Sequence, residues 1–287
     1  MPSRVPLVLA ILLLSTAAPL IRAAAPVPPL AIAALRISLA ALALAAIAGR
    51  DLASLRRLGR TERALVLAAG LLLGVHFGVW ITSLSFTSTA ASVALVATNP
   101  MFAALLGWII GDSVSRREWI GIGVAAGGCA ILAGGDWQAG GDALIGDGLA
   151  VLGAATAAAY LIVGRRLREA LPLFPYLAAV NGVAGIGLMI ATAVAGVTVL
   201  ELGGGVTAWS YAAIAASALF ASVGGHTLLN VAVRRVPTHL VALAILGEPI
   251  GASLLSWAAF GEVPPWTAAA GGVVILCGIG VGFAGKR

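Results

Sequence analysis

Charged residues are scarce in this sequence: Asp, Glu, Lys and Arg together make up 10% of its 287 residues. A soluble globular domain carries about 25% of these residue types. Hydrophobic residues instead reach 61%, and the mean hydropathy is +1.07. Water therefore cannot be the solvent for most of the surface, and the composition excludes an ordinary soluble domain.

Cysteine, histidine and lysine are also few. Cys129 and Cys277 lie in apolar runs without a partner at metal-ligand or redox spacing, so we predict that both are packing residues. The sequence has no His-Glu-x-x-His segment and no paired carboxylates, which argues against a membrane-embedded enzyme. A metal site made by His76 and His226 would have only Glu248 as a third ligand. We therefore predict no catalytic residue, no metal site and no cofactor.

Apolar runs fill most of the chain, and the connections between them are too short to hold a soluble domain. A window of about 19 residues, the length that crosses a bilayer as a helix, detects ten such runs. We therefore predict an all-α integral membrane protein with ten transmembrane helices. The runs lie near residues 5–21, 30–48, 64–83, 90–110, 119–133, 145–163, 175–197, 210–233, 238–260 and 266–283.

Basic residues lie in every second connection, in short clusters that do not form a stripe beside aromatic residues. Cytoplasmic loops retain Lys and Arg, so both termini are predicted in the cytoplasm, and the pattern argues against nucleic-acid binding. Only Arg22 and Arg36 depart from it. The basic clusters contain Arg4, Arg50, Arg56, Arg57, Arg60, Arg63, Arg116, Arg117, Arg165, Arg166, Arg168, Arg234, Arg235, Lys286 and Arg287, and the opposite connections contain Asp136, Asp142, Asp147, Glu201 and Glu262.

The two halves of the chain are similar to each other at an offset of about 150 residues. At an offset of 150, His76 matches His226 and Gly111-Asp112 matches Gly261-Glu262. At an offset of 149, Asn99-Pro100 matches Glu248-Pro249. Five helices per half is an odd number, so the second half enters the membrane from the opposite side. We predict two inverted five-helix repeats, residues 1–136 and 137–287, whose equivalent residues meet near the bilayer midplane.

The segment Ala97–Leu106 (ATNPMFAALL), which leads to Gly111-Asp112, and the segment Leu246–Ala252 (LGEPIGA), which leads to Gly261-Glu262, carry a family resemblance. Together with Pro-Pro-Leu before the second helix, they resemble the EamA-domain branch of the drug/metabolite transporter superfamily. The resemblance covers nearly the whole chain. It implies ten helices, a central cavity between the halves, and export of small metabolites such as amino acids or related compounds.

Two matched polar faces are candidates for the walls of that cavity. His76 and Trp80 lie four residues apart on one helix face, and His226 and Asn230 repeat the spacing in the eighth helix. Gly70, Gly74 and Gly78 form a small-residue face on the other side of the third helix, where another helix can approach closely. Alternatively, each histidine donates to a neighbouring carbonyl and only joins helices. We favour the cavity, because the repeat brings both histidines near the axis.

Glu248 is the one acidic residue that we predict deep in the bilayer, where a charge costs roughly 3 kcal/mol. It could change between protonated and charged states during transport, or it could be a neutral structural residue. Arg36 in the second helix could bind a substrate carboxylate, pair with Glu248, or extend outward to the interface.

Pro100 and Pro249 lie within predicted helices and could act as hinges or as permanent kinks. Further polar residues, among them Asn181, are more typical of helix contacts than of ligand contacts. We add Asn99 and Tyr160 to the candidate cavity. The complete set is Arg36, His76, Trp80, Asn99, Tyr160, His226, Asn230 and Glu248.

These features favour a secondary transporter that exports a small metabolite across the cytoplasmic membrane of a bacterium by alternating access. A lipid or precursor flippase and an uptake carrier of the same fold stay open, and a flippase would need a cavity that is continuous with lipid. A channel is disfavoured because no ring of charges or filter-like segment repeats. The predicted partners are a small-molecule substrate and the lipid bilayer, and the pattern is compatible with proton coupling and with a homodimer.

Overall fold

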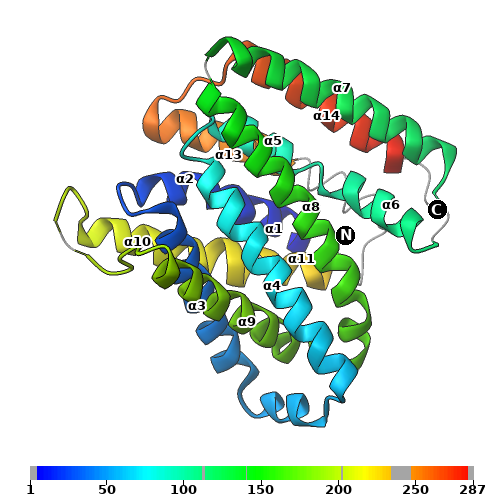
Figure 1. Cartoon of the computed structure of the whole chain (residues 1–287), viewed down its shortest axis with the longest axis vertical. Helices are drawn as coiled ribbons and strands as arrows, with labels where there is room; N and C mark the ends of the chain where they lie inside the picture. Colours follow the sequence, from blue (N-terminus) through cyan, green and yellow to red (C-terminus); the bar gives the residue numbers. More distant parts are fainter. Residues whose placement is uncertain (1–4, 112–113, 140, 202, 234–246, 284–287) are drawn as a thin grey trace.

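The computed structural model describes residues 5–111, 114–139, 141–201, 203–233 and 247–283, and these are helical almost throughout (Figure 1). The described helices are α1 (Val5–Ser15), α2 (Ala17–Ala23), α3 (Pro29–Ala48), the 3-10 helix η1 (Gly49–Arg57), α4 (Arg60–Ser83), α5 (Thr89–Val96), α6 (Asn99–Ile109), α7 (Arg116–Ala139), α8 (Gly141–Ala170), α9 (Leu173–Val194), α10 (Ala208–Ser217), the π-helix η2 (Ala218–Gly225), α11 (His226–Val233), α13 (Gly247–Phe260) and α14 (Trp266–Phe283).

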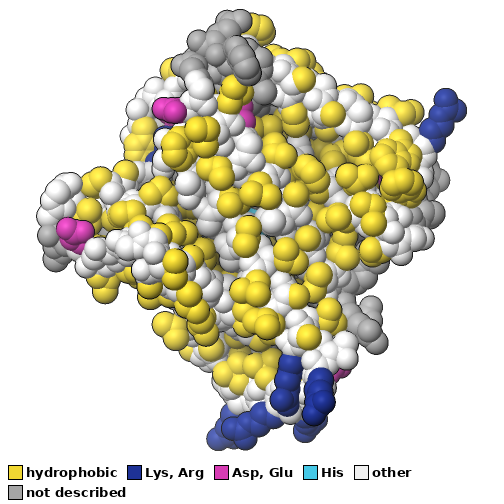
Figure 2. Space-filling model, in the orientation of Figure 1, with side chains coloured by type: hydrophobic (Ala, Val, Ile, Leu, Met, Phe, Trp, Pro, Cys, Tyr) yellow, Lys and Arg dark blue, Asp and Glu magenta, His cyan; other side chains and the backbone are white. Residues whose placement is uncertain are grey.

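Seven helical stretches in the described part of the chain are long and apolar enough to cross a bilayer. Each coincides with one predicted span; the described helices α7, α13 and α14 lie at the positions of the other three, of which the ninth is described only from Gly247 onward. The exposed faces are apolar, as a lipid environment requires, and Figure 2 shows hydrophobic side chains over much of the visible surface. The seven stretches are Pro6–Ala23, Pro29–Arg57, Arg60–Ser83, Thr89–Ile109, Gly141–Gly164, Leu173–Val194 and Ala208–Leu229.

The fourth predicted span is broken into α5 and α6 just before Pro100, which lies in the first turn of α6. Proline has no backbone N–H and cannot supply the fourth-residue donor to Val96. The chain instead tightens to bonds over three residues: the Thr98 N–H donates to the Leu95 carbonyl (3.1 Å) and the Met101 N–H to the Thr98 carbonyl (2.8 Å). The fourth predicted span is therefore interrupted at Pro100, and whether Pro100 acts as a hinge or as a permanent kink stays a prediction. Pro249 lies in the first turn of α13, and the preceding residues 234–246 are outside the described ones.

The prediction that Asp147 lies in a connection was wrong. Helix α8 begins at Gly141, and Asp147 is inside it with only 5% of its surface exposed. The reason is a close approach beside it: a Cβ on Gly146 would lie 2.9 Å from side-chain atoms of Phe86 and Thr87. Hydropathy along the chain cannot detect such a contact, because it depends on a segment sixty residues away.

Equivalent helices of the two halves pack against each other. The second helix of each half, α3 and α9, form one such pair, and the last helix of each half, α7 and α14, form another. Helix α4 contacts α8 and α9, while α1 contacts η2, α11 and α13. This is the pairing expected of two repeats related by a twofold axis.

The bundle has two chemically different ends. The arginine-rich end is formed by η1 and the start of α4, with Arg50, Arg56, Arg57, Arg60 and Arg63 exposed. The acidic end carries Glu201 and Glu262, and the loop after Glu201 reaches Pro26. In Figure 2 the dark blue side chains lie mainly at the lower edge and at the right, and most of the magenta ones at the left and upper left.

Helices α7 and α14 approach so closely that only glycine fits at several contacts. A Cβ on Gly128 would lie 2.7 Å from the Ile275 backbone nitrogen and 2.8 Å from the Gly271 carbonyl oxygen. We expect Gly128→Ala to destabilise the protein by about 1–3 kcal/mol, because the helices must separate. The melting temperature in detergent, followed by size-exclusion chromatography of heated samples, measures this.

The adjacent Gly127 provides a matched control. A Cβ on Gly127 would meet no atom within 4 Å. Gly127→Ala should leave the melting temperature unchanged or raise it, since alanine is favoured over glycine in a helix by about 1 kcal/mol. Equal melting temperatures for the two variants would contradict the close contact.

Candidate functional site

A cavity of about 310 Å³ lies between the two halves and is lined from α1, α3, α4, α8, α9, η2, α11 and α13, together with residues of α5 and α6. It is large enough for a small metabolite. The side chain of Asn230 is outside the described ones. The other seven predicted cavity residues line the cavity: Arg36, His76, Trp80, Asn99, Tyr160, His226 and Glu248.

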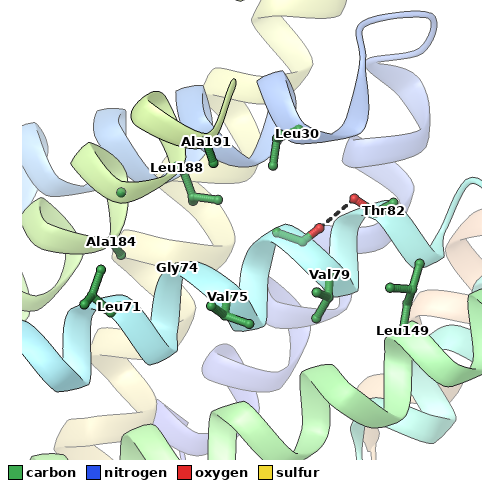
Figure 3. A pocket seen from close by; sticks show the side chains of 12 residues that line it. Leu30, Leu71, Gly74, Val75, Val79, Thr82, Leu149, Ala184, Leu188 and Ala191 are labelled. Atoms are coloured by element: carbon green, nitrogen blue, oxygen red, sulfur yellow. Dashed lines mark hydrogen bonds between the residues drawn. The ribbon is translucent and has the colours of Figure 1, made fainter. Parts of the chain in front are cut away.

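Helix α4 separates this cavity from a second hollow. His76 and Trp80 face the cavity, whereas Gly74 and Gly78 line an open apolar groove of about 320 Å³ with Leu71 and residues of α3, α8 and α9. Figure 3 shows this groove, with Leu188 and Ala191 of α9 across from α4 and Thr82 bonded to its own helix. The cavity and the groove share no described lining residue.

The small-residue face of α4 packs on α9, as predicted. Ideal Cβ atoms on Gly74 and Gly78 would lie 3.3 Å from the Ala184 carbonyl oxygen and 3.2 Å from the Leu188 side chain. The glycines therefore set the distance of α9, and they leave the histidine face of α4 directed at the cavity.

Arg36 is the largest fully buried side chain among the described residues, with 1% of its surface exposed. Its guanidinium carbon lies 4.8 Å from the ring centre of Phe77 and 5.5 Å from that of Trp80, within the range of cation–π attraction. Among the described residues, its Nε and Nη1 atoms have no hydrogen-bond partner, and neither has Nε1 of Trp80. The alternative that Arg36 extends outward to the interface was wrong, because the apolar helix faces around it bury the side chain completely.

His76 combines the two roles that the sequence left open. Its Nδ1 atom lies 2.8 Å from the Gly153 carbonyl oxygen of α8, so the ring joins two helices as well as lining the cavity. A carbonyl only accepts, so Nδ1 carries the proton of this bond. The ring is nearly parallel to that of Trp80 at 6.2 Å, and Phe77 links the group to His226, also at 6.2 Å.

Glu248 is the second residue of α13, and it lines the same cavity as Arg36. The Ser15 hydroxyl of α1 donates to the Glu248 backbone carbonyl at 3.4 Å, which fixes α13 against α1. Asn99, which matches Glu248 in the repeat, lines the same cavity from the first turn of α6.

The cavity extends toward the arginine-rich end of the bundle. Leu44 lies four residues before the end of α3, and Leu177 four residues after the start of α9. Tyr160 lies on this side too, and its hydroxyl accepts a hydrogen bond from Tyr176 at 3.2 Å. Near the acidic end the described core contains the buried apolar side chains of Ala18, Ile21, Ala24, Ile81 and Leu84, none of which lines the cavity.

Several lining residues were missed by the sequence reasoning, among them Phe77 and Asn181. Phe77 contacts Arg36 and both histidine rings, and its position directly after His76 was an available signal. Asn181 was interpreted as a helix contact, but it lines the cavity while its amide donates to the Leu177 carbonyl of its own helix at 2.8 Å. In the described part of the chain, no group of three His, Cys, Asp or Glu side chains is arranged to hold a metal ion.

Comparison with known proteins agrees with this architecture. The model of the EamA-like transporter family matches residues 5–134 and 144–283, that is, both halves of the chain. A crystal structure with 19% sequence identity has the same fold, with a TM-score of 0.66 over 100% of this chain and 98% of the other. A search of curated proteins gave no match.

Proposed function

Because the chain belongs to the EamA-like transporter family and is a multi-pass membrane protein, we propose that it exports a small metabolite, an amino acid or a related compound, by alternating access. One observation carries this proposal: a cavity between the halves in whose wall a buried arginine keeps two hydrogen-bond donors without a partner among the described residues. A buried donor left unsatisfied costs about 1–3 kcal/mol. A substrate carboxylate supplies the missing acceptors.

The chemistry of the cavity suits a molecule with both charges. Nε and Nη1 of Arg36 and Nε1 of Trp80 are donors for a carboxylate. Glu248 lines the same cavity and is an acceptor for an ammonium group. Apolar residues such as Leu14, Leu73 and Leu229 line the rest, which suits an uncharged side chain.

The proposed topology has ten transmembrane helices in two inverted repeats, residues 1–136 and 137–287, with both termini in the cytoplasm of a bacterial cell. The seven long apolar stretches and the segregation of arginines from acids support it. In this orientation the arginine-rich end is cytoplasmic and the acidic end faces outward. The cavity, which extends toward the arginine-rich end, would then receive substrate from the cytoplasm.

The proposed cycle rocks one half against the other around the cavity. Pro100 is the candidate hinge within the described chain, since the helix is interrupted there, and Pro249 is its repeat equivalent. Glu248 is the candidate for proton coupling, because it is a carboxyl group inside the substrate cavity. His76, Asn99, Tyr160, His226 and Asn230 complete the proposed binding residues.

A flippase is the main competing function. Its substrate needs a polar cavity that is continuous with lipid for the headgroup to move along. The groove that faces lipid beside α4 is apolar and shares no described lining residue with the central cavity. This separation favours a carrier of small soluble molecules over a flippase.

Comparison of extracellular metabolites tests the proposal. We expect a bacterial host that expresses this chain to accumulate at least one carboxylate-bearing metabolite in the medium, relative to an empty-vector strain with matched growth. The compound is then tested in proteoliposomes loaded with its isotope-labelled form. If no metabolite changes although the protein is inserted in the membrane, export is wrong, and inward transport in the same proteoliposomes distinguishes an uptake carrier from a flippase.

A further inference from the structure

A polar network at the acidic end joins the two halves of the chain. Arg22 lies in the last turn of α2, Thr89 is the first residue of α5, and Glu262 follows α13. The guanidinium Nε of Arg22 lies 3.2 Å from a carboxylate oxygen of Glu262. Arg22 and Thr89 belong to the first half and Glu262 to the second, so every bond to Glu262 crosses between the halves.

The network is connected through the Thr89 hydroxyl. Arg22 Nε donates to this hydroxyl at 2.6 Å, and the hydroxyl donates in turn to Glu262 Oε2 at 2.8 Å. The Thr89 backbone N–H donates to Glu262 Oε1 at 2.6 Å, and Arg22 Nη2 donates to the Thr87 carbonyl at 2.8 Å. Both carboxylate oxygens of Glu262 therefore accept bonds from the first half. Charge-assisted bonds of this kind are about twice as strong as neutral ones.

The backbone directs Glu262 to this position. Gly261 directly follows α13; its φ of +67° favours glycine, and its N–H donates to the Trp257 carbonyl at 2.8 Å. The chain turns there and brings the next residue over the amino end of α5. A carboxylate is stabilised at a helix amino terminus by the exposed N–H groups and the helix dipole. In the Gly-Glu pair, the glycine turns the chain and the glutamate then binds the amino end of α5.

We propose that Arg22, Thr89 and Glu262 form a latch that keeps the acidic end of the transport pathway closed and opens once per transport cycle. This proposal rests on the alternating-access function proposed above. The latch lies beyond the packed layer of Ile21, Ala24 and Leu84, so this layer cannot separate along the α2–α13 side while the latch is closed. With side-chain exposures of 28% for Arg22 and 21% for Glu262, water can reach both groups and solvate them when they part.

The latch can be tested without knowledge of the substrate. In a chain with Cys129→Ala and Cys277→Ala, Ser222→Cys introduces one thiol into the cavity wall. A membrane-impermeant maleimide added to intact cells reports how often the cavity opens outward. We expect Arg22→Gln and Glu262→Gln each to raise the labelling rate about tenfold, the shift produced by a loss of about 1.4 kcal/mol.

Controls separate the latch from folding, orientation and function. Glu201→Gln removes an exposed acid at the same end without touching the latch and should leave labelling unchanged. Thr89→Val keeps the size and the backbone N–H but loses the bridging hydroxyl, and should raise labelling less than Glu262→Gln. Ser54→Cys on η1, at the opposite end, should stay unlabelled in intact cells and become labelled in inside-out vesicles.

The outcomes are distinct. Unchanged Ser222→Cys labelling in correctly sized, folded Arg22→Gln and Glu262→Gln proteins would overturn the latch, whatever the substrate is. Raised labelling in cells that export no metabolite would support the latch while the proposed export fails. If Ser54→Cys is labelled from outside, the orientation is reversed, and the same comparison is made in inside-out vesicles.

Discussion

Arg36→Leu should reduce transport of a carboxylate substrate by about 30- to 5,000-fold. The guanidinium holds two donors without a partner among the described residues, beside the indole N–H of Trp80. A charge-assisted contact to a buried carboxylate contributes about 2–5 kcal/mol when one partner is removed. The loss is measured as the initial rate of efflux from proteoliposomes at substrate concentrations below saturation.

Unlike its transport rate, the stability of Arg36→Leu should not fall. This difference distinguishes a binding role of Arg36 from a structural one. Arg36 is 1% exposed, and a buried charge whose bonds are incomplete costs free energy that leucine does not. We therefore expect Arg36→Leu to melt at the same temperature as the unmodified protein or higher. If Arg36→Leu unfolds, or if it transports at the normal rate, the proposed carboxylate contact is wrong.

Arg36→Lys is the conservative comparison. Lysine keeps the positive charge but has a single ammonium group where arginine has a planar fork. We expect an intermediate transport rate, and a weaker preference for the carboxylate over the corresponding carboxamide. A substrate for which Arg36→Leu and Arg36→Lys give equal rates would bind elsewhere in the cavity.

Much of the architecture follows from one-dimensional patterns. The apolar runs predicted where helices form, because each helix must satisfy its own backbone in lipid. Spacing along α4 predicted its two faces, with Gly74 and Gly78 toward α9 and His76 and Trp80 toward the cavity. The missing N–H of proline indicated an irregular backbone at Pro100, and the structure has a helix break there. These features depend on residues that are close together in the sequence.

Features that depend on distant segments were not predicted. Asp147 is buried because Gly146 packs against Phe86 and Thr87, and Phe77 joins the cavity because Arg36 of another helix lies over its ring. The latch is a case where a signal was available. Arg22 was the one basic residue in the acidic connections, and such an exception to the charge pattern is a reason to look for an acidic partner.

Glu248→Gln should abolish accumulation that is driven by a proton gradient, with at least a tenfold loss, while exchange of substrate across the membrane continues. Glutamine keeps the size and the polar contacts of glutamate but can neither take up a proton nor carry the negative charge opposite Arg36. Proteoliposomes with and without an imposed pH gradient separate the two activities. The exchange rate also serves as the folding control.

The internal repeat allows a stricter test of whether the Glu248 carboxyl group couples transport to the proton gradient. Asn99 matches Glu248 in the other half and lines the same cavity, so Asn99→Glu combined with Glu248→Asn moves the carboxyl group across the pseudo-twofold axis. If coupling needs one carboxyl group near the axis, this double variant should regain part of the gradient-driven accumulation that Glu248→Gln loses. Glu118→Gln, which changes a buried acid that caps α7 outside the cavity, should retain coupling. Normal gradient-driven accumulation by Glu248→Gln would instead make Glu248 a structural residue, since a group that cannot hold a proton cannot couple its movement to that of the substrate.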